Sequence, residues 1–183
     1  SWEYSADATA ITFTLRPGLT YSDGTPLTAA AFADAARRSI HPANTGYYQG
    51  TLAMLRGAEA IIAADPADEA ALDALYAELG VSTPDERTIS FAFTRPTPFF
   101  HTLASLWVLF PAPQELVEAG GEGWSFDAAN LLGNGPFQIV AVDEDAGLIE
   151  LRPNARYWNG APGLDGLQLR FYDEPDAALA AYK

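Results

Sequence analysis

Cysteine is absent from the 183 residues, so the chain can form neither a disulfide nor a thiolate metal site, and it offers no thiol nucleophile. Lysine is scarce as well, because Lys183 is the only one and the other nine of the ten basic residues are arginines. Against these ten stand 24 acidic residues, which give a formal net charge of −14. Such a surface repels phosphates and anionic lipid headgroups, and we therefore expect no nucleic-acid partner.

Long apolar segments are also missing. The longest one, residues 103–110, is interrupted by Ser105 and falls far short of the roughly 20 residues that cross a bilayer. The chain has no recognisable signal peptide either. We therefore expect that this chain does not insert into a membrane, and that any export signal lies upstream of Ser1.

The sequence lacks the common motifs that indicate a catalytic or metal site. It contains no Gly-x-Ser-x-Gly elbow, no His-Glu-x-x-His and no phosphate-binding P-loop, and its two histidines, His41 and His101, have no metal-ligand spacing. The acidic run 143–145 lacks the regularly spaced oxygen ligands of a calcium loop, so we interpret it as a solvated hairpin turn. We expect no catalytic residue, no metal and no cofactor, although a pair of carboxylates leaves a hydrolase open as an alternative.

Strand and helix patterns alternate along the chain. Alternation of apolar and polar residues predicts strands over residues 11–16, 87–93, 137–142, 148–152 and 167–172, whereas helical spacing predicts helices over residues 29–39, 57–64, 68–79 and 176–182 and a short one after Pro98. The acidic run 143–145 lies in the five-residue turn of a predicted hairpin. The fold class is therefore mixed α/β (α+β).

The helix predicted over residues 29–39 has a clear apolar stripe. Phe32, Ala35, Ala36 and Ile40 recur at helical spacing, so we expect the helix to pack by its Phe32 face and to bury Phe32. Thr28 precedes the helix and could cap it, with its hydroxyl accepting from the first amides.

Two blocks of sequence have an unusually specific order. In the first, an alternating strand leads into Tyr21-Ser22-Asp23-Gly24-Thr25-Pro26-Leu27-Thr28 and then into an alanine-rich helix. The second begins with Gly133-Asn134-Gly135-Pro136-Phe137 and continues to Asn154-Ala155-Arg156-Tyr157-Trp158. Its first part could be mistaken for a phosphate loop, but it leads into a strand and not into a helix. We expect instead a backbone role, since glycine and asparagine tolerate positive φ and the proline would fix the entry into the strand.

Together these blocks resemble the family 5 extracellular solute-binding proteins of bacterial ABC importers, the oligopeptide- and dipeptide-binding type, over nearly the whole chain. The chain departs from the pattern at Ala31, where the family usually has an acidic residue, and at Pro153, which separates Arg152 from Asn154. The resemblance implies a fold like that of type II periplasmic binding proteins. Residues 1–110 would form most of the smaller lobe and residues 111–183 part of the main lobe. Because family members are much longer, we expect a fragment.

The resemblance also implies the function. A protein of this kind captures extracytoplasmic peptides or similar small solutes in a cleft between its lobes and delivers them to ABC permease subunits in the membrane. It would be periplasmic or lipid-anchored at the cell surface, monomeric, not an enzyme and without a cofactor. The main alternative is a structural or interaction module unconnected to transport.

Tyr47 and Tyr48 are the candidate ligand-binding residues. They follow the predicted helix and its proline-containing turn, where family members have a tyrosine that approaches the bound peptide. The alternative for both is a place in the core, since tyrosine has an apolar body. We expect Trp107, Trp124 and Trp158 to be packing anchors.

Overall fold

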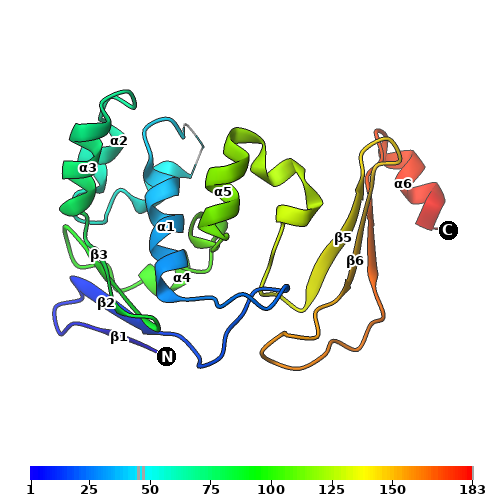
Figure 1. Ribbon diagram of the computed structural model, residues 1–183, viewed down its shortest axis with the longest axis horizontal. Helices are drawn as coiled ribbons and strands as arrows, with labels where there is room; N and C mark the ends of the chain where they lie inside the picture. Colours follow the sequence, from blue (N-terminus) through cyan, green and yellow to red (C-terminus); the bar gives the residue numbers. More distant parts are fainter. Residues whose placement is uncertain (45, 47, 183) are drawn as a thin grey trace. The chain divides into compact units, whose positions relative to one another are not determined.

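The computed structural model covers Ser1–Lys183 and describes residues 1–44, 46 and 48–182. These residues form two compact units. Unit 1 comprises Ser1–Gly18 and Thr28–Pro111, and unit 2 comprises Leu19–Leu27 and Ala112–Lys183 (Figure 1). The chain therefore passes between the units three times, at 18/19, 27/28 and 111/112. The assignment of residues 1–110 and 111–183 to two lobes stays a prediction.

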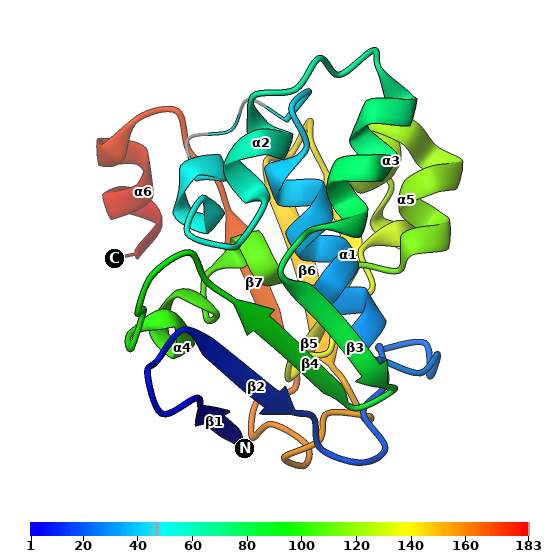
Figure 2. The same cartoon turned by 90° about the vertical axis from the view of Figure 1, so that its left-hand side faces the viewer.

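Unit 1 contains a four-stranded antiparallel sheet (Figure 2). Its order is β1 (Trp2–Tyr4), β2 (Ala10–Thr14), β4 (Thr88–Ala92) and β3 (Val81–Asp85). In β2 and β4, Ile11 lies opposite Phe91, and both side chains are buried. The predicted strands at 11–16 and 87–93 are thus confirmed as β2 and β4, because their alternation marks one face of the sheet as core.

Helices cover the core face of this sheet. They are α1 (Ala29–Ile40), α2 (Ala58–Ile62), α3 (Glu69–Ala77) and α4 (Phe100–Leu103), joined by the 3-10 turns η1 (Gln49–Leu52) and η2 (Trp107–Leu109). In α4, Phe100 is fully buried, with its ring centroid 5.0 Å from that of Phe91 and 4.8 Å from that of Phe93. This group of rings forms the centre of the unit 1 core.

Helix α1 packs differently from its predicted stripe. Its buried residues are Ala29, Ala33, Ala35, Ala36 and Ile40. Phe32 is only partly buried, and it lines an apolar hollow of about 110 Å³ together with side chains such as Phe13 and Leu109. The prediction that α1 buries Phe32 is therefore wrong in degree, because small alanines occupy the places of closest approach. The predicted cap is also wrong, since the Thr28 side chain makes no capping hydrogen bond.

Replacing Phe32 by alanine is expected to lower the free energy of unfolding by about 2 kcal/mol, below the roughly 3–5 kcal/mol typical of a fully buried phenylalanine. The ring already borders a hollow and remains partly in water, so less packing is lost. Urea unfolding of the variant measures this, with Phe110→Ala, which truncates an exposed ring, as the control. A loss in the fully buried range would contradict the partial burial.

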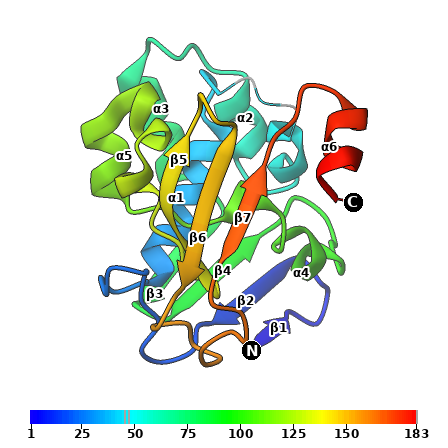
Figure 3. The same cartoon turned by 90° about the vertical axis from the view of Figure 1, so that its right-hand side faces the viewer.

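Unit 2 contains a three-stranded antiparallel sheet (Figure 3). Its order is β5 (Phe137–Asp143), β6 (Leu148–Pro153) and β7 (Leu167–Arg170). The predicted hairpin is confirmed, with Gly147 at φ +55° in its turn and the Asp143 carboxylate accepting from the Ala146 amide at 2.9 Å. The remaining elements are α5 (Gln114–Gly120), the 3-10 segments η3 (Gly121–Phe126) and η4 (Ala128–Asn130), and α6 (Pro175–Tyr182). Within the described residues, no helix has the length and apolar character that crossing a membrane requires.

Candidate functional site

Two aromatic side chains lie together on the surface of unit 1. Tyr48 is 44% exposed and Trp107 is 54% exposed. Their ring centroids are 4.5 Å apart and the ring planes meet at 78°, an edge-to-face arrangement of the kind that aromatic pairs prefer. We call these two residues the aromatic pair. Together the two rings present a larger contiguous apolar surface than a single exposed side chain does.

The residue after each member of the aromatic pair is hydrogen-bonded to the C-terminal end of α1. The Ser39 hydroxyl donates to the Val108 carbonyl at 2.6 Å and so ties η2, which begins at Trp107, to the helix. The side-chain amide of Gln49, the residue after Tyr48, donates to the His41 carbonyl at 2.9 Å. The backbone next to each ring is therefore attached to the same helix terminus.

The aromatic residues singled out in the sequence differ in their exposure in the structure. Tyr48 is not a core residue, so the alternative placing it in the core is wrong, and its role in ligand binding stays a prediction. Tyr47 lies outside the described residues. Trp107 and Trp158 were expected to be packing anchors, but they are 54% and 46% exposed, so that prediction is wrong for both. Trp124 is partly buried and its carbonyl accepts from the Asn130 side chain at 2.9 Å.

Trp107 is the residue that the sequence pattern missed. It lies in the apolar run Leu106-Trp107-Val108-Leu109-Phe110, which suggests a fully buried segment. In the structure this run forms a 3-10 turn, in which residues three apart lie on the same side. Val108 and Leu109 are buried, whereas Trp107 and Phe110 are exposed.

In unit 2, the two parts of the second sequence block meet at Asn154, which is 1% exposed. Its backbone amide donates to the Pro136 carbonyl at 2.8 Å, and its side-chain amide donates to the Gly135 carbonyl at 2.9 Å. Its side-chain oxygen accepts from the Arg156 amide at 2.9 Å. Asn154 thus joins the turn before β5 to the segment after β6.

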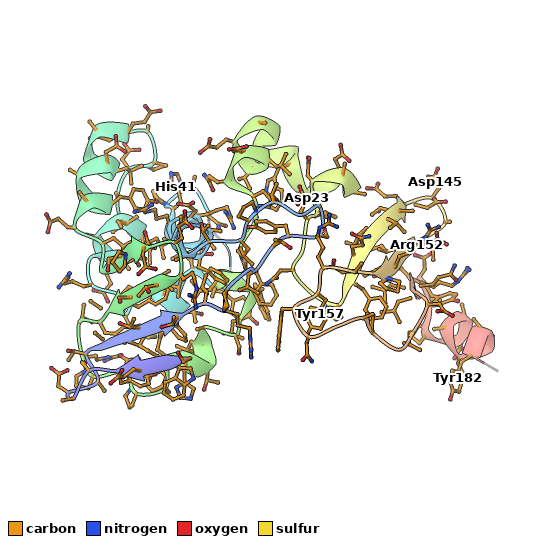
Figure 4. The ribbon with its side chains drawn as sticks, turned by 60° about the horizontal axis from the view of Figure 1, so that its bottom comes forward. Asp23, His41, Asp145, Arg152, Tyr157 and Tyr182 are labelled. Atoms are coloured by element: carbon orange, nitrogen blue, oxygen red, sulfur yellow. The ribbon has the colours of Figure 1, made fainter. Side chains whose placement is uncertain are left out.

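The Asp23-Gly24 turn of the first block reaches the same region of unit 2. Asp23, labelled in Figure 4, accepts from the Thr25 amide at 2.9 Å and from the Thr25 hydroxyl at 2.7 Å. These hydrogen bonds, and then the positive charge of Arg156, lower the pKa of the Asp23 carboxyl. Gly24 has φ +100°, and a Cβ there would lie 2.8 Å from Nε of Arg156. The Asp23-Gly24 turn, the turn before β5 and the segment after β6 therefore lie together in unit 2. The hydrogen bonds of their polar groups stabilise these turns.

A hollow of about 260 Å³ lies over the unit 2 sheet. Its lining includes Glu150, Arg152, Asp165 and Gln168. The Gln168 amide donates to the Glu150 carboxylate at 2.9 Å, and the other two polar side chains are exposed. These side chains lie on a solvated face of the sheet. They do not converge on one point, as the titratable groups of a catalytic site would.

Both histidines have structural partners. His101 Nδ1 hydrogen-bonds the Tyr4 hydroxyl at 3.1 Å, and the Trp2 ring stacks on the His101 ring at 4.6 Å. His41 Nδ1 accepts from the Ala43 amide at 3.2 Å within the turn after α1. Among the residues that the structure describes, no group of three or more His, Asp or Glu side chains could hold a metal ion.

Comparison with known proteins gives a consistent match. The model of the bacterial extracellular solute-binding proteins, family 5 Middle, covers residues 1–183. Oligopeptide-binding protein OppA of Bacillus subtilis is 30% identical over 158 residues, which cover 86% of this chain and 27% of that protein. The probable deoxycholate-binding periplasmic protein YgiS of Escherichia coli is 33% identical over 160 residues, 85% of this chain and 28% of that protein.

Solved structures agree on the fold. Haemophilus influenzae OppA in complex with the peptide RPPGFSPFR has a TM-score of 0.84 and 30% identity, and the match covers all of this chain and 34% of that one. The unliganded open form of the murein tripeptide binding protein MppA has a TM-score of 0.82 and 28% identity with the same coverage. The chain spans little more than a quarter of the length of these curated relatives. The predicted fold class, a mixed α/β chain like the type II periplasmic binding proteins, is confirmed. The chain belongs to the bacterial extracellular solute-binding proteins of family 5.

Proposed function

We propose that this protein is the substrate-binding component of an ABC importer, which captures peptides or similar small solutes outside the cytoplasm and delivers them to membrane permease subunits. The observation that carries the proposal is the match of the family model to all 183 residues. Relatives with names that specify oligopeptide, murein peptide or dipeptide binding support peptides as the solute class. The name of YgiS makes an amphipathic small molecule such as deoxycholate the second candidate.

Capture of this kind needs no covalent step. Proteins of this kind close their lobes around a solute by hinge rotation. Backbone groups and a small number of polar side chains then satisfy the hydrogen bonds of the solute, while apolar surfaces exclude water. The aromatic pair supplies both kinds of surface on unit 1, because the Tyr48 ring is apolar and its hydroxyl can donate and accept hydrogen bonds.

Replacing Tyr48 by phenylalanine in the intact protein is expected to weaken peptide binding by about 0.5–1.5 kcal/mol, or roughly 2- to 13-fold. The change keeps the packing against Trp107 and removes only the hydroxyl, which we expect to hydrogen-bond the captured solute. Isothermal titration calorimetry against RPPGFSPFR and shorter peptides measures the effect, and Tyr47→Phe is measured in parallel because Tyr47 is the other candidate.

Tyr76→Phe is the matched control. The Tyr76 hydroxyl donates to the Arg37 carbonyl at 3.2 Å, so its loss should lower stability slightly and leave peptide affinity unchanged. Tyr48→Phe should show the opposite pattern, with weaker binding and little change in melting temperature. If both Tyr47→Phe and Tyr48→Phe bind peptide as the parent does, neither hydroxyl contacts the solute.

A further inference from the structure

The indole of Trp107 is exposed beside the Tyr48 ring. Trp107 is more exposed than Tyr48, at 54% against 44%, although its ring lies only 4.5 Å from that of Tyr48. Phe110 follows three residues later in the same 3-10 turn and is 59% exposed. Aromatic surface therefore continues beyond Tyr48 along this side of unit 1.

Hydrogen bonds hold the backbone that carries the indole, and the Tyr48 ring packs against the indole itself. The Phe110 amide donates to the Trp107 carbonyl at 3.0 Å and closes the 3-10 turn. The Ser39 hydroxyl holds the next residue, Val108, against α1 at 2.6 Å. A ring that is already positioned loses little conformational entropy when a ligand packs against it, which favours its use in binding.

We propose that Trp107 is a second solute-contacting residue and that its indole takes an aromatic ring of the captured solute. The inference rests on the proposed function and adds a solute class to it, namely peptides or other solutes that carry an aromatic side chain. Trp107 would then determine specificity, whereas Tyr48 would supply the hydrogen bond.

Geometry and charge favour an aromatic ring over a cationic group. Aromatic rings associate in edge-to-face or offset arrangements with centroids about 4.5–7 Å apart, and the Tyr48 ring already occupies one such place beside Trp107. A third ring can take another. A cation could also stack on an indole, but the Arg38 guanidinium donates to the Phe110 carbonyl at 3.5 Å and brings a positive charge to this segment.

The test uses the intact protein and tripeptides of alanine in which one position carries phenylalanine, arginine or no replacement. We expect that at one position at least the phenylalanine peptide binds roughly 2- to 13-fold more tightly than trialanine. Trp107→Ala should abolish this preference and change the affinity for trialanine less, whereas Trp107→Phe should keep most of it. Trp158→Ala, which removes an indole that is 46% exposed on unit 2, is the control and should leave the preference intact.

The outcomes separate this inference from the proposed function. A phenylalanine preference that survives Trp107→Ala would overturn the role of Trp107 while leaving solute capture in place. An arginine preference that Trp107→Ala removes would replace the aromatic solute by a cationic one and so overturn the assignment. If neither a peptide nor deoxycholate binds the parent at all, the proposed function fails and the inference falls with it.

Acrylamide quenching of tryptophan fluorescence gives a second readout in the same protein. Without ligand, the difference between the parent and Trp107→Phe should reveal a quenchable component from Trp107, and an aromatic peptide should protect it. If Trp107 is shielded before ligand is added, another part of the protein covers the indole and the inference is wrong.

Discussion

Phe100→Ala is expected to lower the free energy of unfolding by about 3–5 kcal/mol, the range for a buried phenylalanine whose removal leaves a cavity. Phe100 is fully buried at the start of α4, and its ring packs against Phe91 and Phe93 of the unit 1 sheet region. The loss is large because the helix, the strand and the segment after it meet at this ring. Urea unfolding of the variant measures the change.

The preceding residue provides a matched control. Phe99 is 53% exposed, so Phe99→Ala removes the same side chain from a place where most of it remains in water. We expect this control to change the free energy of unfolding by roughly 0.5 kcal/mol or less, as for an ordinary surface substitution. Equal losses for the two variants would show that Phe100 is not at the centre of the core.

Asn154→Ala is expected to destabilise unit 2 by about 2–4 kcal/mol, because a buried polar group left without its partner costs roughly 1–3 kcal/mol. Two partly buried groups would lose their partner, the Gly135 carbonyl and the Arg156 amide, both of which hydrogen-bond the Asn154 side chain at 2.9 Å. Hydrogen exchange of the Arg156 amide should become faster in the variant, because this amide loses its acceptor, and urea unfolding gives the magnitude.

Asn159→Ala is the control for this change, since Asn159 is an exposed asparagine of the same segment. A second variant, Asn154→Asp, keeps the acceptor for the Arg156 amide but places a carboxylate beside the Gly135 carbonyl, so it should also be destabilised. Wild-type stability in both Asn154 variants would mean that the two sequence segments hold together without this side chain.

The sequence predicts those elements whose residues alternate between core and solvent. β2 and β4 follow from such alternation, and the hairpin of β5 and β6 follows from two alternating runs with a short acidic turn between them. β3 was missed because it is an edge strand in which Val81 is only partly buried and the next four residues are exposed. Its Pro84 also argues against a central strand, and an edge position tolerates it.

Predictions of burial failed where packing distance or local backbone geometry decides. Phe32 has the right spacing for the core face of α1, yet the neighbouring alanines allow the helix to approach so closely that the large ring remains at the margin. Trp107 lies in an apolar run, and only the 3-10 turn brings it to the surface. Neither effect can be predicted from hydrophobic periodicity, because the first depends on how closely α1 packs in the core and the second on the local backbone conformation.

The position of the loop 19–27 illustrates a second limit. Its flanking segments belong to unit 1, whereas the loop itself belongs to unit 2, where Gly24 lies against Arg156. More than 130 positions separate these two residues in the chain, so no local pattern could pair them. For the candidate site, the family resemblance indicates the tyrosines, while the exposure of Trp107 comes from the structure alone.

Calorimetric titration of the intact protein with peptides, compared with a Tyr48→Ala and Trp107→Ala double variant, tests the central claim most directly. The proposed function predicts saturable peptide binding by the parent and a loss of affinity in the double variant that exceeds either single substitution. Unchanged hydrogen exchange in the unit 1 core would show that the double variant remains folded. Parent protein that binds no peptide, or a folded double variant that binds peptide as tightly as the parent, would contradict the claim that solute is captured against the aromatic pair.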